Sequence, residues 1–251
     1  MRGQKRAFTL IELLVVIAII AVLVAMLAPV LAAVKSAALQ AVAGRAASQV
    51  YLATNLYMAD HDDTFPPAMY LFGDGQWLTW FGRQTGEAEF DISQGIIGPY
   101  RAKANFRDPT HQYAQNYLGD QSGFGYNYGF IGSDFHITGN YQNFPVCENP
   151  ARSTEISQPS TTVIFATSSF FKAPWLAGGD GLTYDFGFID PPDYWAGNPN
   201  VDFRHFGKRK VVEGENVVRN EGRAIVLHAD GNIRVRRESQ IEPDSFRRTV
   251  R

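Results

Sequence analysis

Apolar residues are concentrated near the beginning of the chain. From Leu13 to Val34 every residue is uncharged and apolar. About 20 such residues are enough for a helix to cross a bilayer, so residues 8–34 are predicted as a transmembrane helix. Arg2, Lys5 and Arg6 precede the run. Positive charge on one flank holds that end in the cytoplasm, so the rest of the chain is expected outside it.

Beyond this run the apolar positions become periodic. They recur three or four residues apart, at Leu39, Val42, Ala46, Val50, Ala53 and Tyr57. That spacing predicts that residues 35–60 form an amphipathic half of the same helix, which packs this stripe against a sheet. The whole helix is expected from about Thr9 to about Met58. Pro29 is predicted to kink the helix rather than end it, because helix formers continue on both sides.

Residues 61–251 have the pattern of a globular β-rich domain. Aromatic and glycine-rich pieces alternate with turn residues, and Thr161–Thr167 is a β-branched, apolar run that predicts a central strand. The segment from Gly178 to Asn200 is rich in Gly, Asp and Pro and is predicted as a surface loop. The expected fold class is α+β, with a long N-terminal helix packed on a C-terminal antiparallel sheet with long loops.

A hairpin is predicted near the C-terminus. Ala224–Ala229 and Ile233–Val235 are apolar runs that flank Asp230-Gly231. Asp-Gly favours a type I′ turn, which needs positive φ at both central residues. Alternation along the first strand predicts that Ile225 and Leu227 share one face.

The charge balance and the remaining side chains limit the function classes. Lys and Arg number 23 against 25 Asp and Glu, so no nucleic-acid partner is expected. A hydrolytic triad could be assembled from Ser168, Ser169, His205, His228 and Asp230. However, the sequence has no nucleophile elbow, phosphate loop, dinucleotide fingerprint or paired-cysteine zinc motif. No catalytic residue is therefore assigned, and the protein is not expected to be an enzyme.

Three carboxylates lie close together where the helix is expected to end. Asp60, Asp62 and Asp63 could supply oxygen ligands to calcium, although their spacing lacks the full EF-hand pattern. A solvated helix end followed by a turn is the favoured interpretation. No metal or other cofactor is assigned, and calcium is retained as an alternative.

Glu12 decides between interpretations of the N-terminus. A secretory signal peptide has an apolar core of about 7–15 residues, shorter than this run. A plain uncleaved anchor explains the length and the basic flank. It does not explain Glu12, because a carboxylate in an apolar helix costs about 2.5–3.5 kcal/mol at mid-bilayer, and less near the interface where Glu12 would lie. An interfacial Glu favoured by the helix dipole remains an alternative for this residue alone.

The context of Glu12 resembles a known family. Residues 5–14 read KRAFTLIELL, which resembles the prepilin-type cleavage and methylation motif of type IV pilins and type II secretion pseudopilins. The resemblance implies that a membrane peptidase cuts between Ala7 and Phe8, releasing leader 1–7, and that Phe8 is then N-methylated. The family usually has Gly before the cut, where this chain has Ala7. Pro29 lies where many family members have a helix-kinking proline.

The same resemblance implies a mode of assembly. Glu12 would pair with the free amine of Phe8 on a neighbouring subunit in a filament core. The implied partners are other pilin or pseudopilin subunits, the prepilin peptidase, an inner-membrane assembly platform and the lipid bilayer. The implied location is the bacterial inner membrane, single-pass, with residues 61–251 outside the cytoplasm, followed by a filament in the periplasm or at the cell surface.

The C-terminal region resembles a pilin-like family named for a His followed by Asp-Gly. The matching residues are His205, Asp230 and Gly231. Many members have about ten residues between the His and the Asp-Gly, whereas Lys208–Glu221 lengthens the gap here, as a loop insertion would. Together the motifs predict a filament subunit, either of a type II secretion pseudopilus or of a surface pilus. The alternative is a single-pass anchored module that binds glycans or proteins.

Overall fold

The computed structural model describes residues 9–72, 75–86, 89–101, 106–111, 115–118, 122–139, 147–172, 179, 181–191, 200–207, 209–212 and 217–249. The chain forms two compact units, Met1–Leu39 and Gln40–Arg251. Both contain part of one helix, α1, which spans Leu10–Asp60. The predicted long helix is confirmed. It continues through Pro29, while the kink at that residue stays a prediction.

In the first unit α1 is apolar and uncovered. Its large apolar side chains between Leu10 and Val34 are each between 45% and 80% exposed. By length and composition α1 is able to cross a membrane, and among the described residues it is the one helix that is. These properties are consistent with the predicted transmembrane helix.

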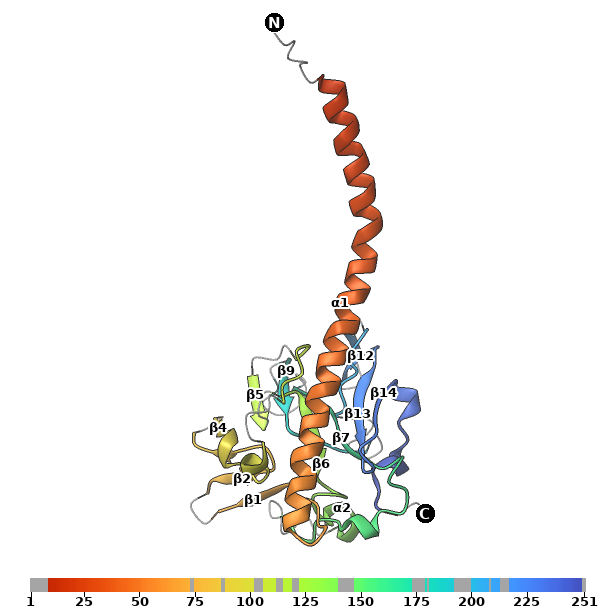
Figure 1. Ribbon diagram of the computed structural model, residues 1–251. Coiled ribbons are helices and arrows are strands. Elements are labelled where there is room, and N and C mark those ends of the chain that lie inside the picture. The colour runs from red at the N-terminus through yellow and green to blue at the C-terminus, as the bar shows by residue number, and fades with distance from the viewer. Residues whose placement is uncertain are drawn as a thin grey trace, which may run out of the picture. The chain divides into compact units, whose positions relative to one another are not determined.

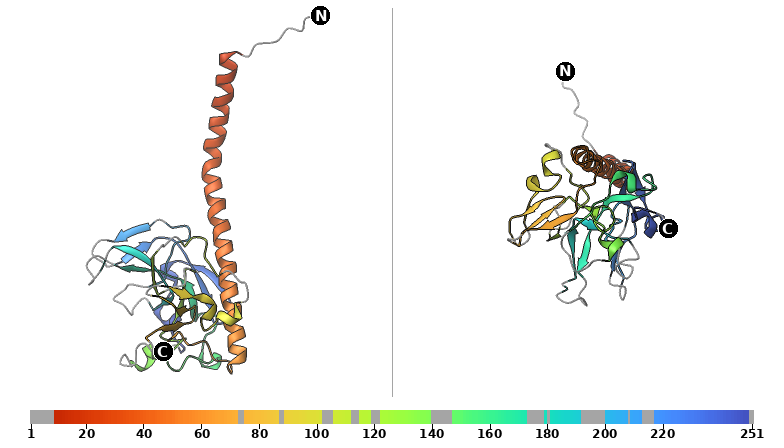
Figure 2. Two further views of the ribbon diagram at one scale, coloured as in Figure 1. Left: turned by 90° about the vertical axis from the view of Figure 1, so that its left-hand side faces the viewer. Right: turned by 90° about the horizontal axis from the view of Figure 1, so that it is seen from below.

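In the second unit α1 packs one stripe against a sheet. Its buried residues are Ala43, Ala46, Ala47, Val50, Ala53, Thr54 and Met58. Three of the predicted stripe residues are therefore buried and Tyr57 packs against the core, but Val42 is 48% exposed and Ala43 is buried in its place. Alanines dominate this stripe because their small side chains let the helix backbone lie close to the strands. Figure 2 shows this half of α1 along one side of the domain, with the strands beside it.

A five-stranded sheet forms the centre of the domain (Figure 1). Its strands, in spatial order, are β10 (Phe188–Ile189), β6 (Phe124–Asn127), β7 (Val163–Thr167), β13 (Ala224–His228) and β14 (Ile233–Arg236). The predicted central strand is β7. The neighbours β6 and β13 are antiparallel to β7, but β10 runs parallel to β6. The sheet is therefore mixed rather than purely antiparallel.

Smaller sheets and short helices surround this centre. A four-stranded sheet contains β1 (Met69–Leu71), β2 (Trp77–Thr79), β3 (Arg83–Gln84) and β4 (Phe90–Asp91). A three-stranded sheet contains β5 (Gln115–Leu118), β9 (Leu182–Phe186) and β8 (Phe170–Lys172), and a separate hairpin contains β11 (Arg209–Val212) and β12 (Val217–Asn220). The short helices are α2 (Phe135–Thr138) and the 3-10 turns Ile92–Gln94, Gly98–Tyr100, Ser153–Glu155, Glu238–Gln240 and Pro243–Phe246.

The prediction of a surface loop from Gly178 to Asn200 is wrong. This segment contains β9 and β10, and Phe188 and Ile189 are buried. The glycines and prolines suggested a loop, but the apolar residues between them fill the core and the strands pair with segments distant in sequence. Apolar burial outweighs the local turn signals here.

The two faces of β13 pack into different cores. Ile225 packs with Ala43, Ala46 and Ala47 of α1, and Leu227 lies in the cluster that contains Val50. Val226 faces the other way, into a cluster with Phe203 and Phe246. The predicted alternation along this strand is confirmed.

Candidate functional site

The first part of the predicted site is the start of α1. Ala7 and Phe8, the predicted cleavage positions, and the predicted N-methylation at Phe8 lie outside the described residues. Thr9 immediately precedes the helix, and Glu12 lies in its first turn. The Glu12 Oε2 atom accepts hydrogen bonds from the Thr9 backbone N–H at 2.9 Å and from the Thr9 hydroxyl at 2.8 Å. In return, the Glu12 N–H donates to the Thr9 hydroxyl oxygen at 3.3 Å.

These contacts form a capping box, in which the two side chains satisfy backbone groups at the helix start. The pattern Thr-x-x-Glu in the sequence signals this capping box, although the capping role of Thr9 was not among the predictions. Glu12 is thus held at the helix start by Thr9 within one chain. Any pairing of Glu12 with a neighbouring chain would have to share or replace these bonds.

The second part is the Asp-Gly turn between β13 and β14. The hairpin is confirmed, but the predicted type I′ turn is wrong. The loop has three residues, Ala229–Gly231, and only Gly231 has a positive φ, of 83°. The Ala229 N–H donates to the Thr162 carbonyl and the Asp230 N–H to the Pro159 carbonyl. These bonds hold the extra residue in place, and a left-handed glycine is what a three-residue hairpin loop requires.

Asp230 and Gly231 have separate local roles in this turn. The Asp230 carboxylate accepts a hydrogen bond from the Asn232 N–H at 2.9 Å. An ideal Cβ on Gly231 would lie 2.4 Å from Cε1 of Tyr51 on α1. Glycine is therefore required both by the backbone conformation and by the close approach of the aromatic ring.

Replacing Gly231 by alanine is expected to lower the free energy of unfolding by about 1–3 kcal/mol, because a side chain is forced into a left-handed conformation and against Tyr51. Thermal unfolding of the full chain in detergent measures the effect. Gly75→Ala is the matched control, since Gly75 has φ of 81° and no atom within 4 Å of its ideal Cβ. A loss no larger than that of the control would show that the Tyr51 contact is unimportant.

The third part is a buried polar cluster around His205. The His205 ring Nε2 lies 3.1 Å from the Asp108 Oδ2 atom, and both side chains are almost fully buried. Arg204 Nε lies 3.5 Å from Asp108 Oδ2 and 3.4 Å from Asp202 Oδ2. The same guanidinium donates to the His111 Nδ1 atom at 2.8 Å. His205 therefore belongs to an ionic network that joins distant parts of the chain.

The carbonyls of two strand ends complete this network. Arg204 donates from one terminal nitrogen to the backbone oxygens of Gly123 and Ser168. Gly123 directly precedes β6 and Ser168 directly follows β7. A buried charge requires partners of this kind, because its removal from water is otherwise too costly. The network therefore ties the ends of two sheet strands to the segment that carries His205.

The charges in the cluster shift the pKa values of its members. Burial by itself would raise the pKa of Asp108, but the hydrogen bond from His205 and the charge of Arg204 outweigh it and hold the pKa at about 2. Burial lowers the pKa of His111 to about 3, and the charge of Arg204 acts in the same direction. Asp108 is therefore ionised and His111 neutral at physiological pH, which suits a structural ion-pair network.

His205 and the Asp-Gly turn do not form one site. The backbone of His205 exchanges both N–H···O bonds with Arg223, just before β13 begins. Asp230 and Gly231 follow the other end of the same strand. The hairpin β11–β12 lies between His205 and β13 in the sequence, and its flanking residues Gly207 and Gly222 are in contact. The segment between Gly207 and Gly222, which lengthens the spacing between His205 and Asp230, therefore begins and ends at neighbouring points of the domain.

The remaining candidate residues are likewise dispersed. The Ser168 hydroxyl donates to the Phe186 carbonyl, and His228 Nδ1 lies 3.0 Å from the Asn232 carbonyl oxygen. These hydrogen bonds hold Ser168 and His228 to backbone carbonyls rather than to each other. Among the described residues no group of three His, Cys, Asp or Glu is arranged to hold a metal ion. Calcium binding at Asp60, Asp62 and Asp63 stays an untested alternative.

Comparison with known proteins identifies the N-terminal segment. A family model described as the prokaryotic N-terminal methylation motif matches residues 2–28. No curated protein and no solved structure matches the chain. The match covers Ala7, Phe8 and Glu12, and it ends one residue before Pro29.

Proposed function

We propose that this chain, a type IV pilin-like protein by its N-terminal motif and its long apolar helix, is a structural subunit of a type IV pilus-like or type II secretion filament. The motif marks a prepilin-type substrate. Such a substrate is anchored through its apolar helix in the inner membrane and is processed by prepilin peptidase. In the proposal, an assembly platform in that membrane then transfers the processed subunit to the filament core.

The observation that carries the proposal is the uncovered surface of α1. Isoleucine, leucine and valine side chains from Leu10 to Val34 are about half exposed or more, which far exceeds the apolar patches that soluble monomers leave uncovered. A bilayer covers such a surface before assembly, and the helices of neighbouring subunits cover it afterwards. Glu12 adds the feature that a simple anchor does not need, because it places a carboxylate at the start of this apolar surface.

The type of motif suggests a structural rather than an enzymatic protein. The five-stranded sheet and its surrounding loops would then form the outer surface of the filament. A pseudopilus and a surface pilus are both assembled through a processed N-terminal helix of this kind, so the proposal includes both.

The proposal predicts processing at one peptide bond. In bacteria that contain prepilin peptidase, intact-mass and N-terminal analysis are expected to find a chain that begins at methylated Phe8. Cells that lack the peptidase should retain the full leader. Ala7→Gly is the positive control, because it restores the residue that is usual before the cut. If the Ala7→Gly variant were processed and the natural chain kept Met1, the natural chain would be an unprocessed anchored module and the proposal would be wrong.

A further inference from the structure

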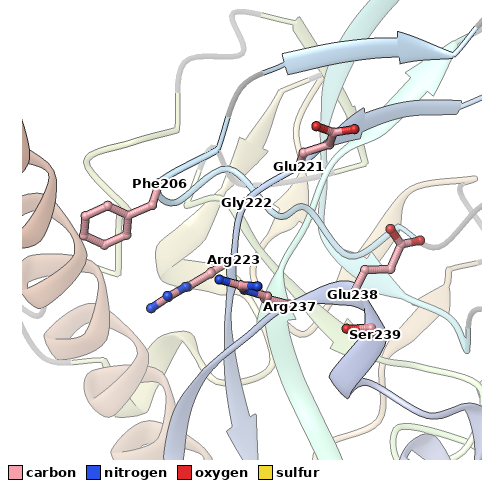
Figure 3. A pocket seen from close by; sticks show the side chains of 7 residues that line it. All are labelled: Phe206, Glu221, Gly222, Arg223, Arg237, Glu238 and Ser239. Carbon is pink, nitrogen blue, oxygen red and sulfur yellow. The ribbon is translucent and has the colours of Figure 1, made fainter.

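Two arginines line a pocket beside the start of β13 and the end of β14 (Figure 3). Its volume is about 510 Å³, which is within the range of sites that bind small groups. Arg223 lies just before β13 and Arg237 just after β14, with Phe206 on one flank and Ser239 on the other. Phe206 is 50% exposed, and the Arg223 guanidinium lies 5.9 Å from the centre of its ring.

The two arginines are available for an external anion. Both side chains are exposed, and neither is paired with a carboxylate in the part of the chain that the structure describes. Glu221 and Glu238 also line the pocket, and each has an interaction of its own in the structure. Two guanidinium groups beside an aromatic ring are suited to bind carboxylates through charge-assisted hydrogen bonds.

The chain carries a matching acidic segment at the end of α1. Asp62 and Asp63 follow the helix and are exposed, and their φ angles of 51° and 56° place them in a tight left-handed turn. The Asp63 N–H donates to the Met58 carbonyl, and the Ser153 N–H donates to the Asp63 carbonyl. The backbone is thus held from both sides. Within the described residues neither carboxylate has a basic partner.

The pocket and the acidic turn lie at opposite ends of the domain. Ile225 of β13 packs near Ala43 of α1, and Gly231 beyond the other end of the strand approaches Tyr51. β13 and this half of α1 therefore run in the same direction. Arg223, which precedes β13, thus lies near Ala43, at the start of the packed half of α1. From there to Asp60 the helix is about 25 Å long at 1.5 Å per residue. One chain cannot bring its own turn to its own pocket.

We propose that the arginine pocket of one subunit receives the Asp62–Asp63 turn of a second copy, in a head-to-tail contact between globular domains. The inference rests on the proposed filament function and names a contact within it. A contact between two different surfaces leaves one of each surface free on every pair of subunits, so it can repeat along an open chain, as a filament requires. Opposite charges on the two ends set the register of stacking.

The test is a disulfide between copies that leaves the four charged residues in place. His61→Cys introduces a thiol beside the acidic turn and Ser239→Cys introduces one in the pocket. A disulfide needs Cα atoms within about 7 Å, so these two positions can be joined only between chains. Mild oxidation of filaments from the double variant is expected to produce a covalent ladder of three or more copies. Each single variant should give dimers at most. The native Cys147 is buried, and burial raises its thiol pKa to about 11, so it should not contribute.

Charge variants in the double-cysteine background identify the cause of any ladder. Arg223→Glu with Arg237→Glu should abolish it, as should Asp62→Asn with Asp63→Asn, which keeps residues that tolerate positive φ. Glu221→Gln with Glu238→Gln is the matched control and should leave the ladder intact. Processed filaments without a ladder, or a ladder that survives the charge variants, would overturn this contact while the proposed function stands. An unprocessed chain that forms no filaments would overturn both.

Discussion

Replacing Glu12 by glutamine is expected to abolish filament assembly while α1 and its processing remain intact. Glutamine can still complete the capping box with Thr9, because its side-chain oxygen accepts from the backbone as glutamate does. It cannot neutralise the free amine that cleavage creates on Phe8, whose reference pKa is about 7.7–8.0. An unpaired charge at an apolar contact is costly, so docking of the next subunit should fail. Electron microscopy of sheared fibres measures assembly, and intact mass measures cleavage.

Thr9→Ala is the reciprocal control for Glu12→Gln. It removes the hydroxyl partner of Glu12 and should cost about 1 kcal/mol at the helix start. The carboxylate remains, so filaments should still form. If Glu12→Gln assembled as well as the natural chain, the capping box would be the whole role of Glu12 and the intermolecular pairing would be wrong.

Replacing Arg204 by alanine is expected to destabilise the β-rich domain by about 3–5 kcal/mol, the usual cost of leaving buried charges unpaired. The Asp108 and Asp202 side chains are only 0% and 2% exposed, so water cannot replace the guanidinium. Two carbonyls at the ends of β6 and β7 would also lose their donor. Urea unfolding of the full chain in detergent, followed by tryptophan fluorescence, measures the change.

Two further substitutions distinguish charge from geometry in this cluster. Arg204→Lys keeps a positive charge near Asp108 but lacks the planar fork that reaches several acceptors, so an intermediate loss is expected. Arg223→Ala removes an exposed arginine and should change stability by no more than about 0.5 kcal/mol. Equal stability of Arg204→Ala and Arg223→Ala would contradict the structural role of the network.

Helices and hairpins that are formed by residues close together in the sequence could be predicted from the sequence pattern. The apolar run and the stripe beyond it predicted α1, and Asp-Gly between apolar strands predicted the β13–β14 hairpin. The turn type was wrong because Thr162 and Pro159, far from the turn in sequence, accept hydrogen bonds from Ala229 and Asp230. The strands β9 and β10 were missed because their stability depends on partners distant in the chain, and local glycines suggested a loop.

The same distinction applies to the candidate site. Glu12 stood out because a carboxylate is unfavourable beside an apolar run, and Thr9 is readable as its capping partner three residues earlier. The contact of His205 with Asp108 could not be predicted from the sequence, because Asp108 lies 97 residues away and no periodic pattern connects the two residues. Burial of the network is a property of the assembled sheets, which no single segment shows.

The contact between Gly207 and Gly222 makes the β11–β12 hairpin a natural graft point. An ideal Cβ on Gly207 would lie 2.7 Å from the Gly222 Cα, so the two ends of the segment that carries the hairpin lie side by side. Joining them directly would leave about ten residues between His205 and Asp230. Foreign segments, such as an epitope or a fluorophore tag, can therefore replace the hairpin without displacing the backbone pair of His205 and Arg223.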